Sequence, residues 1–431
     1  MPAASTAVFA LVIVLFVAQS ARVGRLHLTA PIVFTALGFL ASRLVEGEVD
    51  ASLVRELAEL TLAVVLFHDA AQVKPRQLRT DAGLCARLLL VGLPLTILLG
   101  YGAAWLLFPG LGIGLALLVA AALAPTDAGL GAATVLNPVV PQRVRRLLNV
   151  ESGLNDGLAT PVVLFAITIA AGTDSERPLI SALEELGKGL VAGVVLGAVA
   201  GLLMGLGRRR GWTEPSLVPV AALAVPLLTY YGSVAAGGNG FVSAFVSGTA
   251  FAWALDRSSR LAPAQSDEDT EQALRFAEWT SVVLGYVVWG LFGYVALADL
   301  SALTWQSAVF ALLSLTVLRM LPVALSLLGS GLRLPTVGFI GWFGPRGLAS
   351  VVFAVLAIES IPSSPELRTV LATMVLTVLL SVLLHGISAD PLAERYGAWA
   401  GCTHPAVETA GSVEPARGRA MPPRIAAVAQ E

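Results

Sequence analysis

The polar residues of segment 149–157, Asn-Val-Glu-Ser-Gly-Leu-Asn-Asp-Gly, lead directly into a long apolar run. Two carboxylates, a hydroxyl and two amides therefore lie in or directly before a segment with the composition of a membrane helix. Glu151 and Asn155 are four residues apart, as are Ser152 and Asp156, so the two pairs occupy neighbouring faces of one helix. An ionised group at the bilayer centre costs about 2.5–3.5 kcal/mol on insertion scales, so we expect this polar face to point into the protein and to have a function.

Five ionisable residues lie deep within apolar segments of the chain: Asp127, Glu151, Asp156, Arg319 and Arg346. The acids outnumber the arginines, so one carboxylate has no arginine to pair with. We expect it to bind a proton or a metal cation reversibly. Asp156 lies ten residues beyond Arg146, which is roughly 15 Å along a helix and close to the bilayer midplane. Carboxylate, hydroxyl and carbonyl oxygens suit a hard monovalent cation. The pattern predicts a proton-coupled cation exchanger.

The composition indicates the elements that must position these residues. Of the 431 residues, 56% are hydrophobic and 13% are charged, whereas soluble domains contain about 25% charged residues. The class is therefore an all-α polytopic membrane protein in contact with lipid. A net charge of −2 argues against nucleic acid as a partner. Two distant cysteines and four scattered histidines predict no disulfide framework, no transition-metal site and no cofactor.

We expect thirteen membrane spans, each with about 20 mainly apolar residues. Most Lys and Arg residues between them fall on one side, which predicts that the N-terminus lies outside and the C-terminus in the cytoplasm of an inner or plasma membrane. Residues 1–388 form the transmembrane domain, and residues 389–431 are expected to be a disordered cytoplasmic tail. The expected spans are 5–21, 27–44, 52–71, 86–108, 111–133, 148–171, 187–206, 215–232, 235–255, 275–297, 302–328, 335–358 and 366–387.

Two of these spans contain helix-breaking residues. Span 111–133 includes Ala-Pro-Thr-Asp at 124–127, and span 335–358 includes Gly-Pro-Arg-Gly at 344–347. Proline removes a backbone donor and glycine lets the chain leave helical geometry, so both spans should be interrupted. If 187–206 is a linker, the interrupted spans are the fifth of two six-helix halves that run in opposite directions. Paired broken helices of this kind predict inverted repeats whose interrupted helices cross at a transport site.

The motifs at 124–127, 151–157 and 344–347 resemble those of the NhaP-type sodium/proton antiporters, in the cation:proton antiporter family that includes the animal Na⁺/H⁺ exchangers. The resemblance extends over all the expected spans. It implies exchange of Na⁺ against H⁺, a core domain that moves against a dimerisation domain, and a homodimer. K⁺ and Li⁺ remain alternatives to Na⁺, because their ligands are of the same type.

The resemblance also implies which residues bind the ions. Asp156 matches the aspartate that takes either Na⁺ or H⁺, and Asp127 matches the aspartate of the first crossing segment. The carbonyl of Thr126 and the side chain of Ser152 match further cation ligands. Asn155 stands where electrogenic relatives have a second aspartate, which implies electroneutral exchange.

Three further residues match supporting positions. Glu151 matches a glutamate that pairs with an arginine, here Arg319, and Arg346 matches the arginine of the second crossing segment. Asp69 corresponds more loosely to an acid that lines a cytoplasmic funnel.

Plainer roles remain open for several of these residues. Asp127 could cap a broken half-helix, Glu151 and Arg319 could form a purely structural pair, and Asp69 could be a solvated carboxylate. Among other functions, an organic-anion transporter would need net positive charge at the crossing, and a channel would need a continuous wet pore. An intramembrane enzyme would need a nucleophile with its base, a zinc motif or two catalytic aspartates, for which Asp127 and Asp156 are the only candidates.

Overall fold

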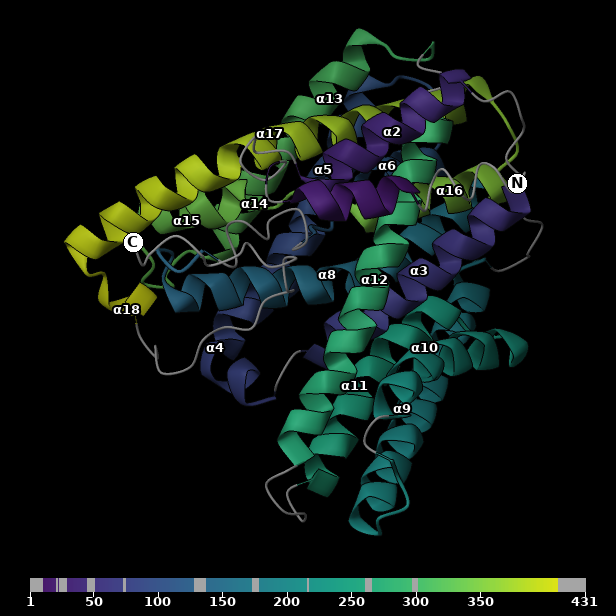
Figure 1. Ribbon diagram of the computed structural model, residues 1–431. Coiled ribbons are helices and arrows are strands. Elements are labelled where there is room, and N and C mark those ends of the chain that lie inside the picture. The colour runs from purple at the N-terminus through teal and green to yellow at the C-terminus, as the bar shows by residue number, and fades with distance from the viewer. Residues whose placement is uncertain are drawn as a thin grey trace.

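The computed structural model describes residues 11–20, 22, 29–44, 51–72, 75–127, 137–172, 178–214, 217–259, 266–296 and 301–409 (Figure 1). These residues form helices and no strand. After an initial helix at Leu11–Ser20, the elements are α2 (Ala30–Leu44), α3 (Ala51–Gln72), α4 (Pro75–Arg87), the π-helical turn η1 (Leu88–Gly92), α5 (Leu93–Leu107), α6 (Ile113–Ala122), α8 (Gln142–Ala170), α9 (Pro178–Arg209), α10 (Val218–Ala235), α11 (Gly240–Ser259), α12 (Ser266–Ala296), α13 (Trp305–Leu315), α14 (Val317–Ser326), α15 (Leu334–Trp342), α16 (Leu348–Ser360), α17 (Pro365–Thr403) and α18 (Ala406–Thr409).

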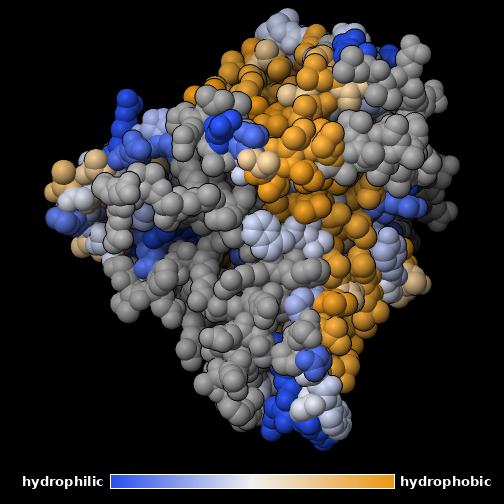
Figure 2. Space-filling view, in the orientation of Figure 1, coloured by the Kyte–Doolittle hydropathy of each residue, from blue (hydrophilic) through white to orange (hydrophobic). Residues whose placement is uncertain are grey.

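Five helical segments within the described residues are long and apolar enough to cross a membrane, and several shorter apolar helices accompany them. Each segment that the sequence predicted as a span overlaps a helix, whereas the number of thirteen spans stays a prediction. Large apolar side chains such as Val191, Leu203 and Leu106 are exposed, and a broad hydrophobic band covers one face of the molecule (Figure 2). Such a surface suits contact with lipid.

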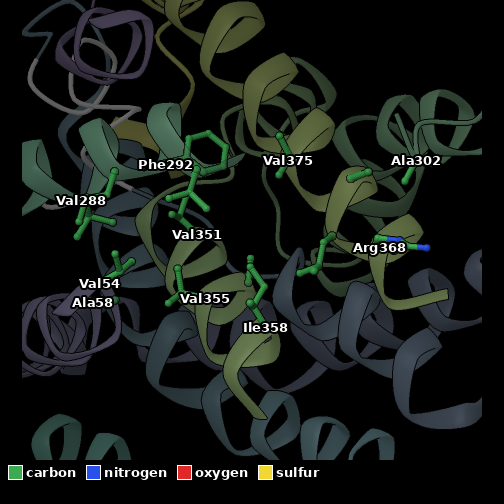
Figure 3. Close-up of a pocket in the computed structure, with 15 residues that line it drawn as sticks. Val54, Ala58, Val288, Phe292, Ala302, Val351, Val355, Ile358, Arg368 and Val375 are labelled. Carbon is green, nitrogen blue, oxygen red and sulfur yellow. The ribbon is translucent and has the colours of Figure 1, made fainter. Parts of the chain in front are cut away.

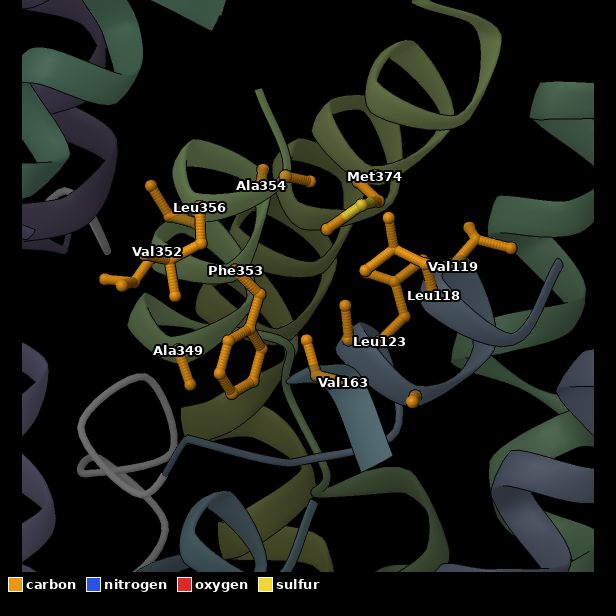
Figure 4. Packing of buried hydrophobic residues seen from close by; sticks show 14 of the residues in the cluster. Leu118, Val119, Leu123, Val163, Ala349, Val352, Phe353, Ala354, Leu356 and Met374 are labelled. Atoms are coloured by element: carbon orange, nitrogen blue, oxygen red, sulfur yellow. The ribbon is translucent and has the colours of Figure 1, made fainter. Parts of the chain in front are cut away.

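Helix α8 lies between two groups of helices (Figure 1). On one side it contacts α3 and α11, which pack with α9, α10 and α12. On the other side it contacts α6 and α16, whose apolar side chains meet those of α17 around Leu118, Val163 and Phe353 (Figure 4). The polar face of α8 is therefore held inside the protein by apolar packing on both sides.

Small residues let α9 and α11 approach closely. A Cβ atom at Gly193, Gly197 or Gly201 of α9 would lie 2.5–2.6 Å from a backbone oxygen of α11. The four-residue spacing puts these glycines on one face of α9, which is the small-residue packing typical of membrane helices. Close contact of backbones thus replaces side-chain interdigitation along this interface.

The structure corrects the predicted tail boundary. We expected no regular structure after residue 388, but α17 continues to Thr403 and α18 follows it. The buried residues Ala389, Ala393, Tyr396 and Ala400 recur at helical spacing. These mostly small side chains form a packing stripe that a search for long apolar runs does not detect. Residues 410–431 lie outside the described part of the chain.

The segment after α17 is anchored to two other helices. Glu408 is buried, and its Oε1 accepts hydrogen bonds from the backbone N–H of Arg333 and the hydroxyl of Thr336, each at 2.9 Å. These two residues begin α15, so the carboxylate caps that helix at its positive end. The carbonyl of Val407 accepts a hydrogen bond of 2.6 Å from Arg143 at the start of α8. The C-terminal end of the described chain therefore connects α15 to α8.

Candidate functional site

The two interrupted spans meet where the sequence predicts a crossing. Helix α6 ends at Ala122, and the chain is non-helical from there to Asp127. Helices α15 and α16 are separated by the non-helical segment 343–347. The backbone N–H of Asp127 donates a 2.8 Å hydrogen bond to the carbonyl of Pro345. A backbone group that has no helical partner in the first interrupted span therefore bonds to one in the second. Ser350 reinforces the crossing by donating to the carbonyl of Ala122 at 2.7 Å.

The carboxylate of Asp127 caps α16. Its Oδ2 accepts a 3.1 Å hydrogen bond from the backbone N–H of Leu348, the first residue of that helix. A negative charge is stabilised at this end of a helix, where backbone donors are unpartnered. A Cβ atom at Gly347 would lie only 2.0 Å from the same oxygen, so glycine is needed there for the carboxylate to fit. The capping role that the sequence left open is therefore present.

Arg346 is fully buried and lies at the opposite kind of helix end. Its guanidinium donates to the carbonyls of Ala124 at 2.8 Å, Pro125 at 3.3 Å and Ser314 at 2.9 Å. The Ser314 carbonyl lies in the last turn of α13, and Ala124 and Pro125 lie within three residues after the C-terminal end of α6. Helix C-termini attract positive charge. The sequence placed Arg346 at the crossing correctly. It did not predict the break after α13, because no glycine or proline occurs at Ser314 or its immediate neighbours.

The polar face of α8 approaches the first crossing segment. The hydroxyls of Thr126 and Ser152 lie 2.9 Å apart, and the amide of Asn155 donates to the Thr126 hydroxyl at 2.7 Å. Asp156 follows Ser152 by one helical turn and is 6% exposed. The Asn155 Oδ1 atom is buried and has no hydrogen-bond partner among the described residues. The structure thus brings together a hydroxyl pair, an amide oxygen and a neighbouring carboxylate, which are the atom types that a monovalent cation requires.

Glu151 and Arg319 form a buried ion pair, which the family resemblance implied. The Arg319 Nη1 and the Glu151 Oε1 are 2.5 Å apart, and each side chain is 3% exposed. Within the part of the chain that the structure describes, the second carboxylate oxygen and the remaining guanidinium nitrogens have no hydrogen-bond partner. A Cβ atom at Gly344 would lie 2.5 Å from the Arg319 Nε, so this guanidinium packs directly against the second crossing segment.

Helix α17 holds both sides of the break between α15 and α16, which the sequence did not indicate. The Ser381 hydroxyl accepts a 2.6 Å hydrogen bond from the backbone N–H of Arg346. One turn further on, the His385 Nε2 lies 2.9 Å from the carbonyl of Trp342, the last residue of α15. The Trp342 indole donates to Ser388 at 3.0 Å and its ring packs on that of His385. Single serines and histidines in a long apolar helix carry no sequence signal for such contacts.

Asp69 lies in α3 and is 5% exposed. It packs against α8, since a Cβ atom at Gly153 would lie 3.5 Å from its carbonyl oxygen. Its neighbour His68 is also buried and contacts Gln72. The structure therefore places Asp69 against the helix that carries Asp156, and a role in a cytoplasmic funnel stays a prediction.

The amino-acid sequence that forms these crossing segments and buried charges matches a known protein family. Residues 9–395 match the family described as sodium/hydrogen exchanger, transmembrane. The chain belongs to this family. It is therefore a multi-pass membrane transporter and not an enzyme, as the motifs of the sequence predicted.

Several known proteins are similar in sequence to this chain. A Na⁺/H⁺ antiporter of Schizosaccharomyces pombe is 28% identical over 376 residues, which cover 80% of this chain and 78% of that protein. The Na⁺/H⁺ antiporter NhaP of Pseudomonas aeruginosa is 28% identical over 78% of this chain and 79% of its own length. A K⁺/H⁺ antiporter, NhaP2 of a Shewanella species, is 27% identical over 86% of this chain, which spans 63% of that protein's length.

The fold is also that of a solved structure. The sodium proton antiporter MjNhaP1 of Methanocaldococcus jannaschii superposes with a TM-score of 0.73. The alignment covers 91% of this chain and 98% of that chain at 20% sequence identity. The all-helical membrane architecture is therefore shared although most residues differ.

Proposed function

We propose that this protein exchanges a monovalent cation, Na⁺ in the first instance, for a proton at Asp156. The observation that carries the proposal is the position of this buried carboxylate, one turn after Ser152, whose hydroxyl contacts Thr126 of the crossing segment. Membership of the sodium/hydrogen exchanger family supports the assignment. Asp156, Ser152, the carbonyl of Thr126 and Asp127 would supply the oxygens for the cation.

The coupling follows from the cost of an ionised carboxylate in a dry passage. Asp156 can move through the membrane interior with a bound cation or with a proton, because either one neutralises the carboxylate. The empty, ionised carboxylate cannot readily make the same movement, because its charge would be uncompensated. Asn155 cannot titrate, so one carboxylate exchanges one cation for one proton and the cycle is electroneutral. The other charges have fixed structural partners. Glu151 pairs with Arg319, and Arg346 lies at two helix C-termini.

We further propose the larger architecture in which this cycle runs. Thirteen spans would form two inverted six-helix repeats, with the N-terminus outside and the C-terminus in the cytoplasm. A core bundle containing α6, α8 and α16 would move against a dimerisation domain within a homodimer. Asp69 would line the cytoplasmic approach to Asp156.

The experiment uses everted membrane vesicles with a pH-sensitive dye. Addition of Na⁺ to vesicles with the wild-type protein should move protons, and Asp156→Asn should abolish this response while the protein remains folded and membrane-inserted. Asp256→Asn is the matched control, because Asp256 is an exposed carboxylate near the end of α11. Sustained Na⁺-driven proton movement by Asp156→Asn would refute the mechanism.

The cation and the charge balance need a second measurement. Relatives include both Na⁺/H⁺ and K⁺/H⁺ antiporters, so Na⁺, K⁺ and Li⁺ should be compared in proteoliposomes of one lipid composition. An electroneutral cycle should give the same rate with and without an imposed membrane voltage. A voltage-dependent rate would instead indicate that the numbers of protons and cations exchanged in each cycle differ.

A further inference from the structure

An apolar pocket lies between two pairs of helices, at a distance from the crossing segments. It has a volume of about 200 Å³ and lies between α3 and α12 on one side and α16 and α17 on the other (Figure 3). Ala58, Phe292 and Ala354 are among its lining residues. No residue that we assign to cation binding lines it. The pocket is therefore distinct from the proposed ion site.

The pocket has a buried floor and an exposed mouth. Ala58 and Phe292 are 2% and 5% exposed, whereas Val295 and Ile358, which also line the pocket, are 43% and 49% exposed. Arg368 in the first turns of α17 is exposed as well, and Figure 3 shows it at the edge of the pocket, with its guanidinium directed away from the apolar lining residues. Among the described residues that line the pocket, it is the only charged one.

The Arg368 guanidinium has no hydrogen bond or ion pair with any residue in the described part of the chain. The pocket thus combines an apolar interior with one available cation at its rim. This is the pattern of a site for an amphiphile whose head group is an anion. Guanidinium is well suited to phosphate because it can donate two parallel hydrogen bonds.

We propose that this pocket binds an anionic phospholipid, with part of one acyl chain between the two helix pairs and the phosphate at Arg368. In a bilayer the chain itself gains little from entering the pocket, because lipid tails are as apolar as the pocket wall. Selectivity must therefore come from the head group. One arginine near anionic lipid favours it by about five-fold over a neutral head group.

The bound chain would also affect transport. It would fill the space between α3 and α12 on one side and α16 and α17 on the other. Because α16 belongs to the second interrupted span, the chain would hold these helices in one relative position and slow the cycle. This consequence rests on the proposed exchange function. The binding itself does not depend on it.

The test uses the full chain in liposomes with a trace of phosphatidylglycerol or phosphatidylcholine that carries the same diazirine-labelled acyl chain. After photolysis, mass spectrometry of peptides should locate the label on α3, α12, α16 or α17 at the pocket. Phosphatidylglycerol should label the wild-type pocket about five-fold more than phosphatidylcholine. Arg368→Gln should remove this preference, and Ala354→Phe should block labelling by filling the space. Arg43→Gln, a substitution at the last turn of α2 outside the pocket, should change neither result.

Equal labelling by the two lipids in the wild type would mean that the pocket takes up an acyl chain without selecting the head group, and this would overturn the proposal. Labelling by neither lipid would mean that protein or another molecule fills the pocket, with the same consequence. A phosphatidylglycerol preference that survives Arg368→Gln would also overturn it. Because photolabelling requires no transport, a protein that failed to exchange cations would refute the proposed function while leaving this test intact.

Discussion

The buried pair of Glu151 and Arg319 allows a quantitative test of how the protein tolerates charge inside the membrane. The two groups are 2.5 Å apart at their closest atoms, with side chains 3% exposed. At roughly 4 Å between charge centres and an effective dielectric constant near 20, their attraction is about 4 kcal/mol. Removing one partner leaves the other charge buried without compensation, which costs about 3–5 kcal/mol.

The perturbation is therefore a double-mutant cycle with Glu151→Gln, Arg319→Met and their combination. Each single substitution should lower the free energy of unfolding by about 3–5 kcal/mol. The double variant removes both charges of the pair and leaves neither without its partner, so it should lose less stability than either single variant. We expect a coupling free energy of about 3 kcal/mol or more, far above the 0.5 kcal/mol scatter of independent sites.

The assay is reversible denaturation of the purified variants in mixed micelles, followed by intrinsic fluorescence. The matched control is the pair of Arg55 and Glu59, which is 2.7 Å apart but has an arginine that is 48% exposed. Arg55→Gln should cost no more than about 0.5 kcal/mol, because water screens such a pair. The reasoning fails if the double variant is as unstable as the sum of the two single variants, or if Arg319→Met costs no more than Arg55→Gln.

Two further substitutions test contacts that the structure defines. Gly347→Ala should destabilise the protein by about 1–3 kcal/mol, because the new Cβ would lie 2.0 Å from the Asp127 carboxylate. Gly338→Ala in α15 meets no atom within 4 Å and should be neutral or stabilising, and equal denaturation midpoints for these two variants would contradict the contact. Glu408→Ala should cost about 1–3 kcal/mol, since it removes the acceptor of the Arg333 backbone N–H and one of the two hydroxyl partners of Thr336. Glu408→Gln keeps an acceptor oxygen and should recover most of that loss in the same assay, whereas an equal loss from both variants would show that the hydrogen bonds are not responsible.

The sequence was most informative at positions where placing a residue in the membrane costs much free energy. Ionisable residues in apolar segments are expensive, so Asp127, Glu151, Asp156, Arg319 and Arg346 could be selected by their surroundings alone. The pairing of Glu151 with Arg319 and the crossing near Arg346 are both present in the structure. Their ion-transport roles stay predictions.

The sequence was less informative where small residues decide the packing. The helix after residue 388 depends on Ala389, Ala393, Tyr396 and Ala400. Alanine is common in loops, tails and helices alike, so its spacing gave a weak signal. The break after α13 also lacked a signal, because its sequence, Ser-Leu-Thr-Val, contains neither glycine nor proline. In the folded protein the break lies beside the Ser314 carbonyl, which accepts a hydrogen bond from Arg346.

The sequence by itself determined that this is a polytopic membrane protein with two proline-interrupted helices, since hydrophobic length and backbone chemistry act locally along the chain. It also determined which residues carry buried charge. Only the tertiary structure decided how those charges are stabilised. Asp127 lies at the positive end of α16 and Arg346 at the negative ends of α6 and α13. A helix end acts as a charge only over its last turn, so that compensation exists only once helices far apart in the chain have been brought into contact.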